Sequence, residues 1–168
     1  MRRFGILMLS FFLLCTACQR EEKFPIEPAI EFISLEKIDD STGVDHRATL
    51  SFHFQDGDGD VGLDATDTDT PFDTASTYYY NCFINYYKKV GGQFQLVEFD
   101  GINFNQRIPR LSKEDSESIE GVIRINLDIN SFDYSTPTDT IKYSLYIVDR
   151  ALHESNTIET TELVVYKR

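Results

Sequence analysis

The sequence contains few cysteines, and their positions exclude a domain held together by disulfides. Of its three cysteines, Cys15 and Cys18 belong to an N-terminal export-type segment, and Cys82 stands alone in the rest of the chain. Export would remove Cys15 and modify Cys18, which leaves Cys82 without an intramolecular partner. We therefore expect Cys82 to be a buried core thiol.

The chain also lacks the short motifs of common enzyme classes. There is no Gly-x-Ser-x-Gly elbow, no His-Glu-x-x-His pair, no P-loop and no cysteine spacing suited to zinc. The three histidines are scattered: His53 alternates with flanking phenylalanines on a strand-like segment, and His46 and His153 fall in predicted loops. We expect no enzymatic activity. A glycoside hydrolase that uses paired carboxylates stays open, because spatial pairing is not visible in a sequence.

Positive charge is scarce as well. The chain has 16 lysines and arginines against 28 aspartates and glutamates, a net charge of -12. Removing residues 1–17, which carry two arginines and no acidic residue, would bring the net charge to -14. Such an acidic surface argues against nucleic acid as a partner and against direct adhesion to anionic lipid.

Helical periodicity is hard to find after residue 30, and strand-like alternation takes its place. Isoleucines and leucine at positions 123 to 129 alternate with polar residues, as in a strand with one wet face. Gly91-Gly92 joins two strand-like runs and is typical of a tight hairpin. We predict one all-β domain over residues 30–168, an immunoglobulin-like antiparallel β-sandwich of about seven strands. The predicted strands span residues 30–38, 48–55, 78–90, 93–99, 121–129, 141–149 and 157–166.

Three aspartates alternate with glycines in the segment Asp56-Gly57-Asp58-Gly59-Asp60-Val61-Gly62. Aspartates are ordinarily ionised at neutral pH, and two such charges about 5 Å apart repel by roughly 3 kcal/mol at an effective dielectric constant near 20. These side chains therefore need a counter-ion to converge. Oxygen ligands without histidine or thiol favour calcium over zinc or copper. We predict a structural Ca²⁺ site at Asp56, Asp58 and Asp60, with a solvated acidic turn as the alternative.

The spacing resembles the calcium loops of EF-hands and dockerins, with clear departures. Loop positions 1, 3, 5, 9 and 12 are Asp56, Asp58, Asp60, Asp64 and Asp67. Val61 replaces the glycine of position 6, and Asp67 replaces the glutamate of position 12. A strand-like segment precedes the loop and Pro71 follows it, so we expect the ion without the two helices. Asp64 is a further candidate ligand. The loop also matches a dinucleotide-binding glycine pattern, but three negative side chains and no following helix exclude a phosphate cradle.

Strand order brings a distant aspartate into consideration. In an immunoglobulin-like sandwich, the loop after the second strand and the loop after the sixth share one end of the domain. Asp149 closes the sixth predicted strand, so it is a candidate ligand, and Asn156 is a weaker one. The alternative for Asp149 is a turn residue that caps its own loop or pairs with Arg150.

The N-terminus has the pattern of a secretory signal. Arg2 and Arg3 precede an apolar run from Phe4 to Leu14, which is too short to span a bilayer. Residues 14–18, Leu-Cys-Thr-Ala-Cys, resemble the bacterial lipoprotein box, which implies lipidation of Cys18 after removal of residues 1–17. Ordinary signal cleavage with a free Cys18 is the alternative. Residues 18–29 would then be a lipidated tether, because a multiply acylated cysteine anchors a protein without a transmembrane helix.

Residues 19–22, Gln-Arg-Glu-Glu, look like the acidic export signal of Bacteroidota surface lipoproteins. Residues 52–62, 79–81, 107–111 and 146–152 together also resemble that family. The resemblance covers most of the chain after the signal. It implies a surface-exposed lipoprotein of the outer membrane with a sandwich domain, and it implies no particular activity.

A tyrosine-rich segment, residues 78–87, is the feature most suited to binding a ligand. If it is a strand, its aromatic side chains alternate onto both faces, and Tyr79 and Tyr87 could stack on sugar rings or anchor a protein partner. Cross-strand aromatic pairing within the domain is the alternative. The sequence therefore favours a calcium-stabilised binding or adhesion module. A structural subunit or spacer of an outer-membrane assembly is the competing hypothesis.

Overall fold

The computed structural model describes residues 24–112, 117–130 and 135–167. The predicted signal segment and Cys18 lie outside these residues. The described part of the chain contains no helix that is long and apolar enough to span a membrane.

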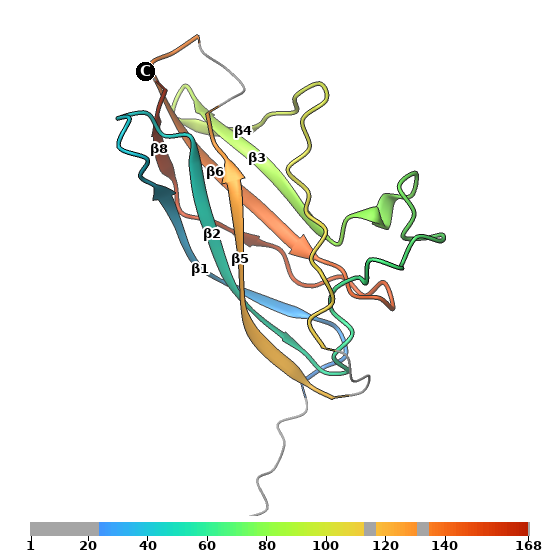
Figure 1. The fold of residues 1–168 in the computed structure, drawn as a ribbon. Coiled ribbons are helices and arrows are strands. Elements are labelled where there is room, and N and C mark those ends of the chain that lie inside the picture. The colour runs from blue at the N-terminus through green and yellow to red at the C-terminus, as the bar shows by residue number, and fades with distance from the viewer. Residues whose placement is uncertain (1–23, 113–116, 131–134, 168) are drawn as a thin grey trace, which may run out of the picture.

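Two antiparallel sheets face each other and enclose the core (Figure 1). The first sheet has the order β1-β2-β5, formed by Ala29–Ile38, Arg47–Asp56 and Ile119–Asp128. The second has the order β4-β3-β6-β7, formed by Gln93–Leu96, Cys82–Val90, Thr138–Ile147 and Ile158–Glu159, and β8, Leu163–Tyr166, also pairs with β6. This arrangement confirms the predicted all-β, immunoglobulin-like sandwich.

The central strands follow from alternation in the sequence. In β5, Ile123, Ile125 and Leu127 are buried, whereas Arg124 and Asn126 between them are exposed. β2 and β6 each lie between two neighbouring strands, and their apolar positions point into the same core. Each apolar side chain buried in this way contributes roughly 1.5–3 kcal/mol relative to an exposed one, so alternation fixes which face of each sheet turns inward.

The Gly91-Gly92 hairpin is present as predicted. Both glycines have positive φ, 60° and 84°, and they connect β3 to β4, with Val90 opposite Gln93. Two successive positive φ angles match the twist of the flanking strands, which is why glycine suits both positions.

The tyrosine-rich segment differs from the prediction at its start. The strand begins at Cys82 rather than at residue 78, and Thr77–Tyr79 form a short 3-10 helix, η1. The side chain of Asn81 donates to the Ile108 carbonyl oxygen (3.0 Å) and accepts from the Ile108 amide (2.6 Å). These two bonds hold the chain before β3 against a distant segment, so Tyr79 does not lie on the sheet.

The last predicted strand is divided into β7 and β8. Between them Thr160 leaves the strand conformation, while its hydroxyl accepts from the Tyr143 amide (3.0 Å) and its amide donates to the Tyr143 carbonyl oxygen (2.9 Å). This division accounts for the eight strands found among the described residues, where seven were expected. The fourth strand is also shorter than predicted: it ends at Leu96 rather than at residue 99.

Cys82 is a fully buried free thiol, as predicted. Burial raises its pKa to about 12. The thiol therefore stays protonated and acts as a small apolar side chain within the core.

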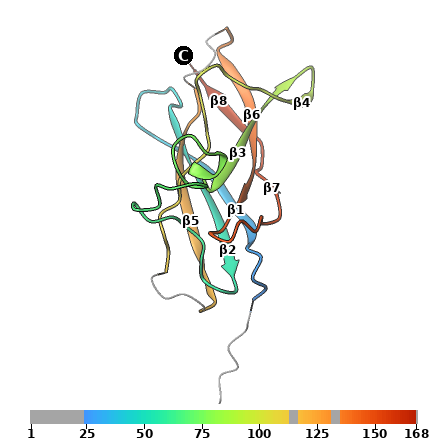
Figure 2. The same ribbon diagram turned by 90° about the vertical axis from the view of Figure 1, so that its right-hand side faces the viewer.

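The first and last described residues lie at opposite ends of the sandwich (Figures 1 and 2). The N-terminal segment joins the domain at the end where β2 finishes at Asp56, and the C-terminal strand β8 ends at the far end. The long connection from β2 to β3 starts at the first of these ends and projects to one side of the sandwich. The aspartate loop therefore shares one end of the domain with the point where the chain enters it.

Candidate metal centre

The aspartate loop turns back sharply at the end of β2. Asp56 is the last residue of that strand, and its Oδ2 accepts a hydrogen bond from the Val61 amide (3.2 Å). Val61 is fully buried, so the loop is fixed by a core side chain where an EF-hand has glycine. Gly59 and Gly62 have φ angles of 74° and 99°, which side chains other than glycine adopt only with strain.

The second arm of the site follows β6. Asp149 lies two residues beyond the end of that strand and is 1% exposed. Its Oδ1 accepts from the His153 amide (2.8 Å), and its Oδ2 lies 2.9 Å from His153 Nδ1. The two loops also meet directly, because the Ala151 amide donates to Asp60 Oδ2 (3.1 Å). Since β2 and β6 belong to different sheets, the site connects the two layers at one end.

Three carboxylates converge where these loops meet. One carboxylate oxygen from each of Asp56, Asp60 and Asp149 lies within 4.8 Å of the others. The Oδ1 atoms of Asp56, Asp58 and Asp60 are buried and have no hydrogen-bond partner among the described residues. Charges at this separation repel by on the order of 3 kcal/mol per pair at an effective dielectric constant of 20. An unpartnered buried carboxylate adds a desolvation cost, which a bound cation would remove.

The pKa values reflect this crowding. Burial, together with the charges of Asp58 and Asp149, raises the pKa of Asp56 to about 6, and burial with the same neighbouring charges raises that of Asp60 to about 6. Burial also raises the pKa of Asp149, although hydrogen bonds from His153 act in the opposite direction. A positive charge at the site would favour the ionised form of all three groups.

The donors that converge here are carboxylate oxygens. The His153 side chain brings a ring nitrogen to the site, but its Nδ1 lies against Asp149 Oδ2 at 2.9 Å. The cluster of Asp56, Asp60 and Asp149 could therefore hold a metal ion through oxygen ligands. Asp149 comes from a loop 93 residues beyond Asp56 in the sequence, and the structure places it where strand order predicted.

Asp64 and Asp67, which matched positions 9 and 12 of the EF-hand loop, contact arginines instead. Asp64 Oδ2 lies 3.2 Å from Arg110 Nη1 and 3.9 Å from Arg150 Nη1. Both carboxylate oxygens of Asp67 accept from Arg150. The structure therefore places Asp64 outside the three-aspartate cluster, because guanidinium groups already neutralise this part of the loop.

Asn156 does not turn towards the cluster either. Its Oδ1 accepts from the Ile30 amide and its Nδ2 donates to the Ile30 carbonyl oxygen, both at 2.9 Å. The side chain thus holds the beginning of β1, and it is not available as a ligand.

Two structural residues of this region carry no recognisable signal in the sequence. His153 orients Asp149, as described above. Arg107 donates from Nη1 to the carbonyl oxygens of Phe72 (3.4 Å) and Tyr79 (2.6 Å), and from Nη2 to those of Asp64 (3.2 Å) and Asp67 (2.8 Å). One guanidinium group therefore ties together the long connection between β2 and β3. Backbone carbonyls are the same in every residue, so local sequence could not identify them as partners.

The two candidate ligand-binding tyrosines lie in different places. The ring of Tyr79 packs edge-on against Tyr80, with centroids 5.0 Å apart, and beneath the Arg107 guanidinium at 5.0 Å. Both Tyr79 and Arg107 line a pocket of about 440 Å³. Tyr87 lies on β3, where Lys142 Nζ is 5.5 Å from its ring centroid. The two tyrosines therefore do not form one surface.

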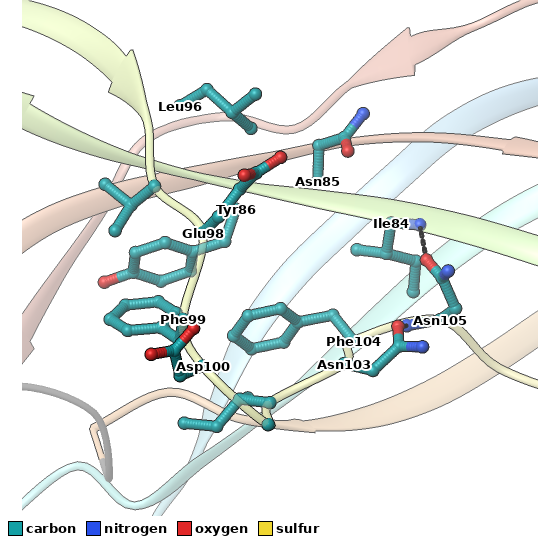
Figure 3. Close-up of a pocket in the computed structure, with 13 residues that line it drawn as sticks. Ile84, Asn85, Tyr86, Leu96, Glu98, Phe99, Asp100, Asn103, Phe104 and Asn105 are labelled. Atoms are coloured by element: carbon teal, nitrogen blue, oxygen red, sulfur yellow. Dashed lines mark hydrogen bonds between the residues drawn. The ribbon is translucent and has the colours of Figure 1, made fainter.

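A further pocket of about 540 Å³ lies between β3 and the segment that follows β4 (Figure 3). Tyr86 and Phe104 stack in it, with ring centroids 5.4 Å apart, and Phe99 meets Tyr86 edge-on. The Asn105 side chain accepts from the Ile84 amide (2.8 Å), as the dashed line shows. Asparagines and two acidic residues surround these rings: Asn85, Asn103, Asn105, Glu98 and Asp100. The pocket thus combines an aromatic wall with hydrogen-bonding groups.

No protein-family model and no curated protein matches this sequence. Two solved structures show a distant similarity. One is a structural-genomics target from Bordetella pertussis described as an ApaA protein, with 10% identity, a TM-score of 0.26, and coverage of 85% of this chain and 95% of that one. The other is the structural-genomics target SoR45, with 10% identity, a TM-score of 0.26, and coverage of 88% and 89%.

Proposed function

We propose that the protein is a calcium-stabilised binding module, anchored to the outer membrane through a lipid on Cys18. The observation that carries the calcium site is the set of Oδ1 atoms of Asp56, Asp58 and Asp60, which are buried without partners in the described residues. Asp149 approaches them from the other sheet. A divalent cation would neutralise these groups and link the two loops, so its first role would be structural.

The ligand type favours calcium among the common cations. Zinc and copper prefer nitrogen and sulfur donors, whereas calcium accepts six to eight oxygens in flexible geometry. Magnesium requires near-ideal octahedral geometry and keeps several of its waters, which suits a buried cluster of carboxylates less well.

Thermal melting of the full chain with calcium tests the site. A site with a dissociation constant of about 10⁻⁴ M, typical of extracellular modules, should add about 1.4 kcal/mol at about 1 mM calcium. Asp58→Asn should remove most of this gain. Asp128→Asn, at an exposed aspartate of β5, serves as the matched control and should keep it. A wild-type melting midpoint that is the same in calcium and in EDTA would contradict the calcium site.

The membrane anchor rests on the lipoprotein-like residues around Cys18. Cys18→Ala should move the protein from the membrane fraction into the soluble fraction, and it should abolish incorporation of labelled palmitate. Cys82→Ala is the matched control, because that thiol is buried in the core. Retention of the Cys18→Ala protein in membranes would count against the anchor.

The binding role rests on aromatic side chains that the fold leaves accessible. On the outer face of the second sheet, Phe83 stacks on Tyr146 with centroids 5.0 Å apart, and Lys142 lies over the rings of Tyr87 and Phe94. These rings are half-buried. Partly exposed rings beside hydrogen-bonding groups suit the stacking of sugar rings and the anchoring of protein side chains. Glycan or protein is thus the ligand class that we propose.

A glycan array probed with the wild type, Tyr87→Ala and Tyr79→Ala tests the ligand. Loss of binding in Tyr87→Ala alone would assign binding to the sheet face, and loss in Tyr79→Ala alone would assign it to the pocket beside Arg107. If the array is silent and pull-down from detergent-solubilised membranes recovers a stable complex, the structural-subunit hypothesis replaces the binding module.

Burial of the carboxylates argues against hydrolysis of glycans at this site. Asp56 is 0% exposed and Asp149 is 1% exposed. A glycosidase needs both of its carboxyl groups in contact with the sugar and with a water molecule, so these two groups could not serve a polymer substrate.

A further inference from the structure

The N-terminal segment Phe24–Ile30 lies directly against the aspartate loop. A Cβ atom added to Gly57 would be 2.2 Å from the Phe24 carbonyl oxygen and 2.4 Å from that of Pro25. The φ angle of Gly57 is outside the left-handed region, so the backbone conformation alone would admit other residues. Gly57 must therefore be glycine because the N-terminal segment occupies the space of its side chain.

The same segment is also held by the loop that carries Asp149. Asn156 bonds both the amide and the carbonyl oxygen of Ile30, and Pro28 is buried just before it. The N-terminal segment thus contacts both loops that meet at the candidate metal centre. Figures 1 and 2 show it leaving the domain at this end.

We propose that a cation bound by Asp56, Asp60 and Asp149 locks the N-terminal segment Phe24–Ile30 onto the domain. This inference rests on the proposed cation site. Gly57 lies between two of the loop aspartates, and Asn156 follows Asp149 by seven residues. Without the ion, repulsion among the carboxylates pushes the two loops apart and displaces both contacts. With the ion bound, the two loops together form one rigid surface against which the segment packs.

The lock gives the ion control over the orientation of the domain. Residues 24–28, which precede β1, connect the domain to the proposed lipid anchor. When they are docked they hold the domain at a fixed angle to its tether, whereas free they let it rotate. Binding energies are reciprocal. The factor by which calcium favours docking of the segment is the factor by which docking raises calcium affinity.

Hydrogen–deuterium exchange of the full chain in detergent micelles tests the lock. Backbone amides of residues 24–30 should exchange at least about 5-fold more slowly in calcium than in EDTA, since couplings between sites are typically of this size or larger. The edge strand β4 serves as the internal reference, because a general gain in stability would slow its exchange as well. The segment should be slowed more than β4.

Two substitutions separate the lock from the ion site. Asn156→Ala removes the bonds to Ile30, and Gly57→Ala places a methyl group where the Phe24 carbonyl oxygen lies. Both substitutions should speed exchange of residues 24–30 in calcium. Each should also weaken calcium binding, measured by calorimetry, by the same factor by which it speeds this exchange. Asn85→Ala, on the outer face of β3, is the matched control and should change neither. Asn156→Ala leaves the aspartate loop intact, so it decides the question if Gly57→Ala does not fold.

The possible failures are distinguishable. If the wild type binds no calcium in calorimetry, the cation site is wrong and the lock is overturned with it. If the wild type binds calcium but residues 24–30 exchange at the same rate in calcium and EDTA, the site stands and the lock is overturned. If Asn156→Ala binds calcium as tightly as the wild type while its segment is loose, the two are uncoupled and the lock is overturned.

Discussion

Individual carboxyl groups at the candidate metal centre determine how the protein responds to pH in the absence of added metal. Burial and the neighbouring aspartates raise the pKa values of Asp56 and Asp60 to about 6, from an ordinary 3.8. Between these values the folded protein holds protons that the unfolded chain has released. The free energy of unfolding therefore falls as pH rises through this window.

We expect the melting midpoint in EDTA to be higher at pH 5 than at pH 7. Calcium should reverse this order, because protons compete with the ion for the same oxygens. The double variant Asp56→Asn, Asp60→Asn should lose most of the pH dependence in EDTA. A midpoint in EDTA that is unchanged or higher at pH 7 would contradict this prediction.

The thiol of Cys82 is predicted to be unreactive in the folded protein. Burial raises its pKa to about 12, and reaction with disulfide reagents requires an exposed thiolate. In a chain with Cys15→Ser and Cys18→Ser, a thiol reagent such as Ellman's reagent should titrate no group in native buffer and one group in urea. Rapid labelling under native conditions would show that β3 opens locally.

Arg107 stabilises the long connection between β2 and β3 rather than the candidate metal centre. Its guanidinium reaches four backbone carbonyl oxygens, a geometry that a single ammonium cannot reproduce. We expect Arg107→Lys to lower the free energy of unfolding in urea by about 1–3 kcal/mol. Arg124→Lys, at an exposed position of β5, should change it by less than about 0.5 kcal/mol. Equal effects of the two substitutions would show that Arg107 is not a structural link.

Among the elements, the strands with one buried and one solvent-exposed face were predictable from the sequence. The alternation of polar and apolar residues in β5 predicted which of its side chains point inward, and the Gly91-Gly92 pair predicted the hairpin. Both predictions succeeded because both signals are local in the sequence. The start of β3 was not predictable. The bonds from Asn81 and Arg107 to residues far away in the chain turn the tyrosines out of the strand.

The candidate site shows the same division between local and distant signals. The loop aspartates stand out by composition, and strand order placed Asp149 beside them. Sequence spacing also nominated Asp64, which the fold pairs with Arg110. The role of His153 and the contact between Phe24 and Gly57 produce no recognisable pattern in the sequence, because each depends on which loops meet in space.

At the scale of the whole molecule, a second buried charged group lies at the opposite end from the candidate metal centre. Asp139 near the start of β6 contacts Lys167 and lies 2.9 Å from Lys88 Nζ. Burial alone would raise the pKa of Asp139, but hydrogen bonds from these lysines outweigh it and lower the pKa. The part of β6 from Asp139 to Ile147 lies between this group and the loop of Asp149 and spans roughly 26 Å.

We expect Asp139→Asn to cost about 3 kcal/mol, because it leaves buried lysine charge without its partner. Calcium affinity, measured by calorimetry, should be unchanged. In a double-mutant cycle with Asp58→Asn in calcium, the two losses of stability should add to within about 0.5 kcal/mol, as for distant sites. A larger interaction energy would show that the two ends of the sandwich communicate.

The placement of the two chain ends has a mechanical consequence. The N-terminal segment enters at one end of the sandwich and β8 ends at the other, so tension between the two chain ends runs along the strands. The ladder between β1 and β2, from Ala29 opposite Gln55 to Ile38 opposite Arg47, is then loaded in shear, and its hydrogen bonds resist together rather than peeling apart one by one. A domain with this geometry is suited to bear force on its tether, and the first bonds to take the load are those beside the aspartate loop.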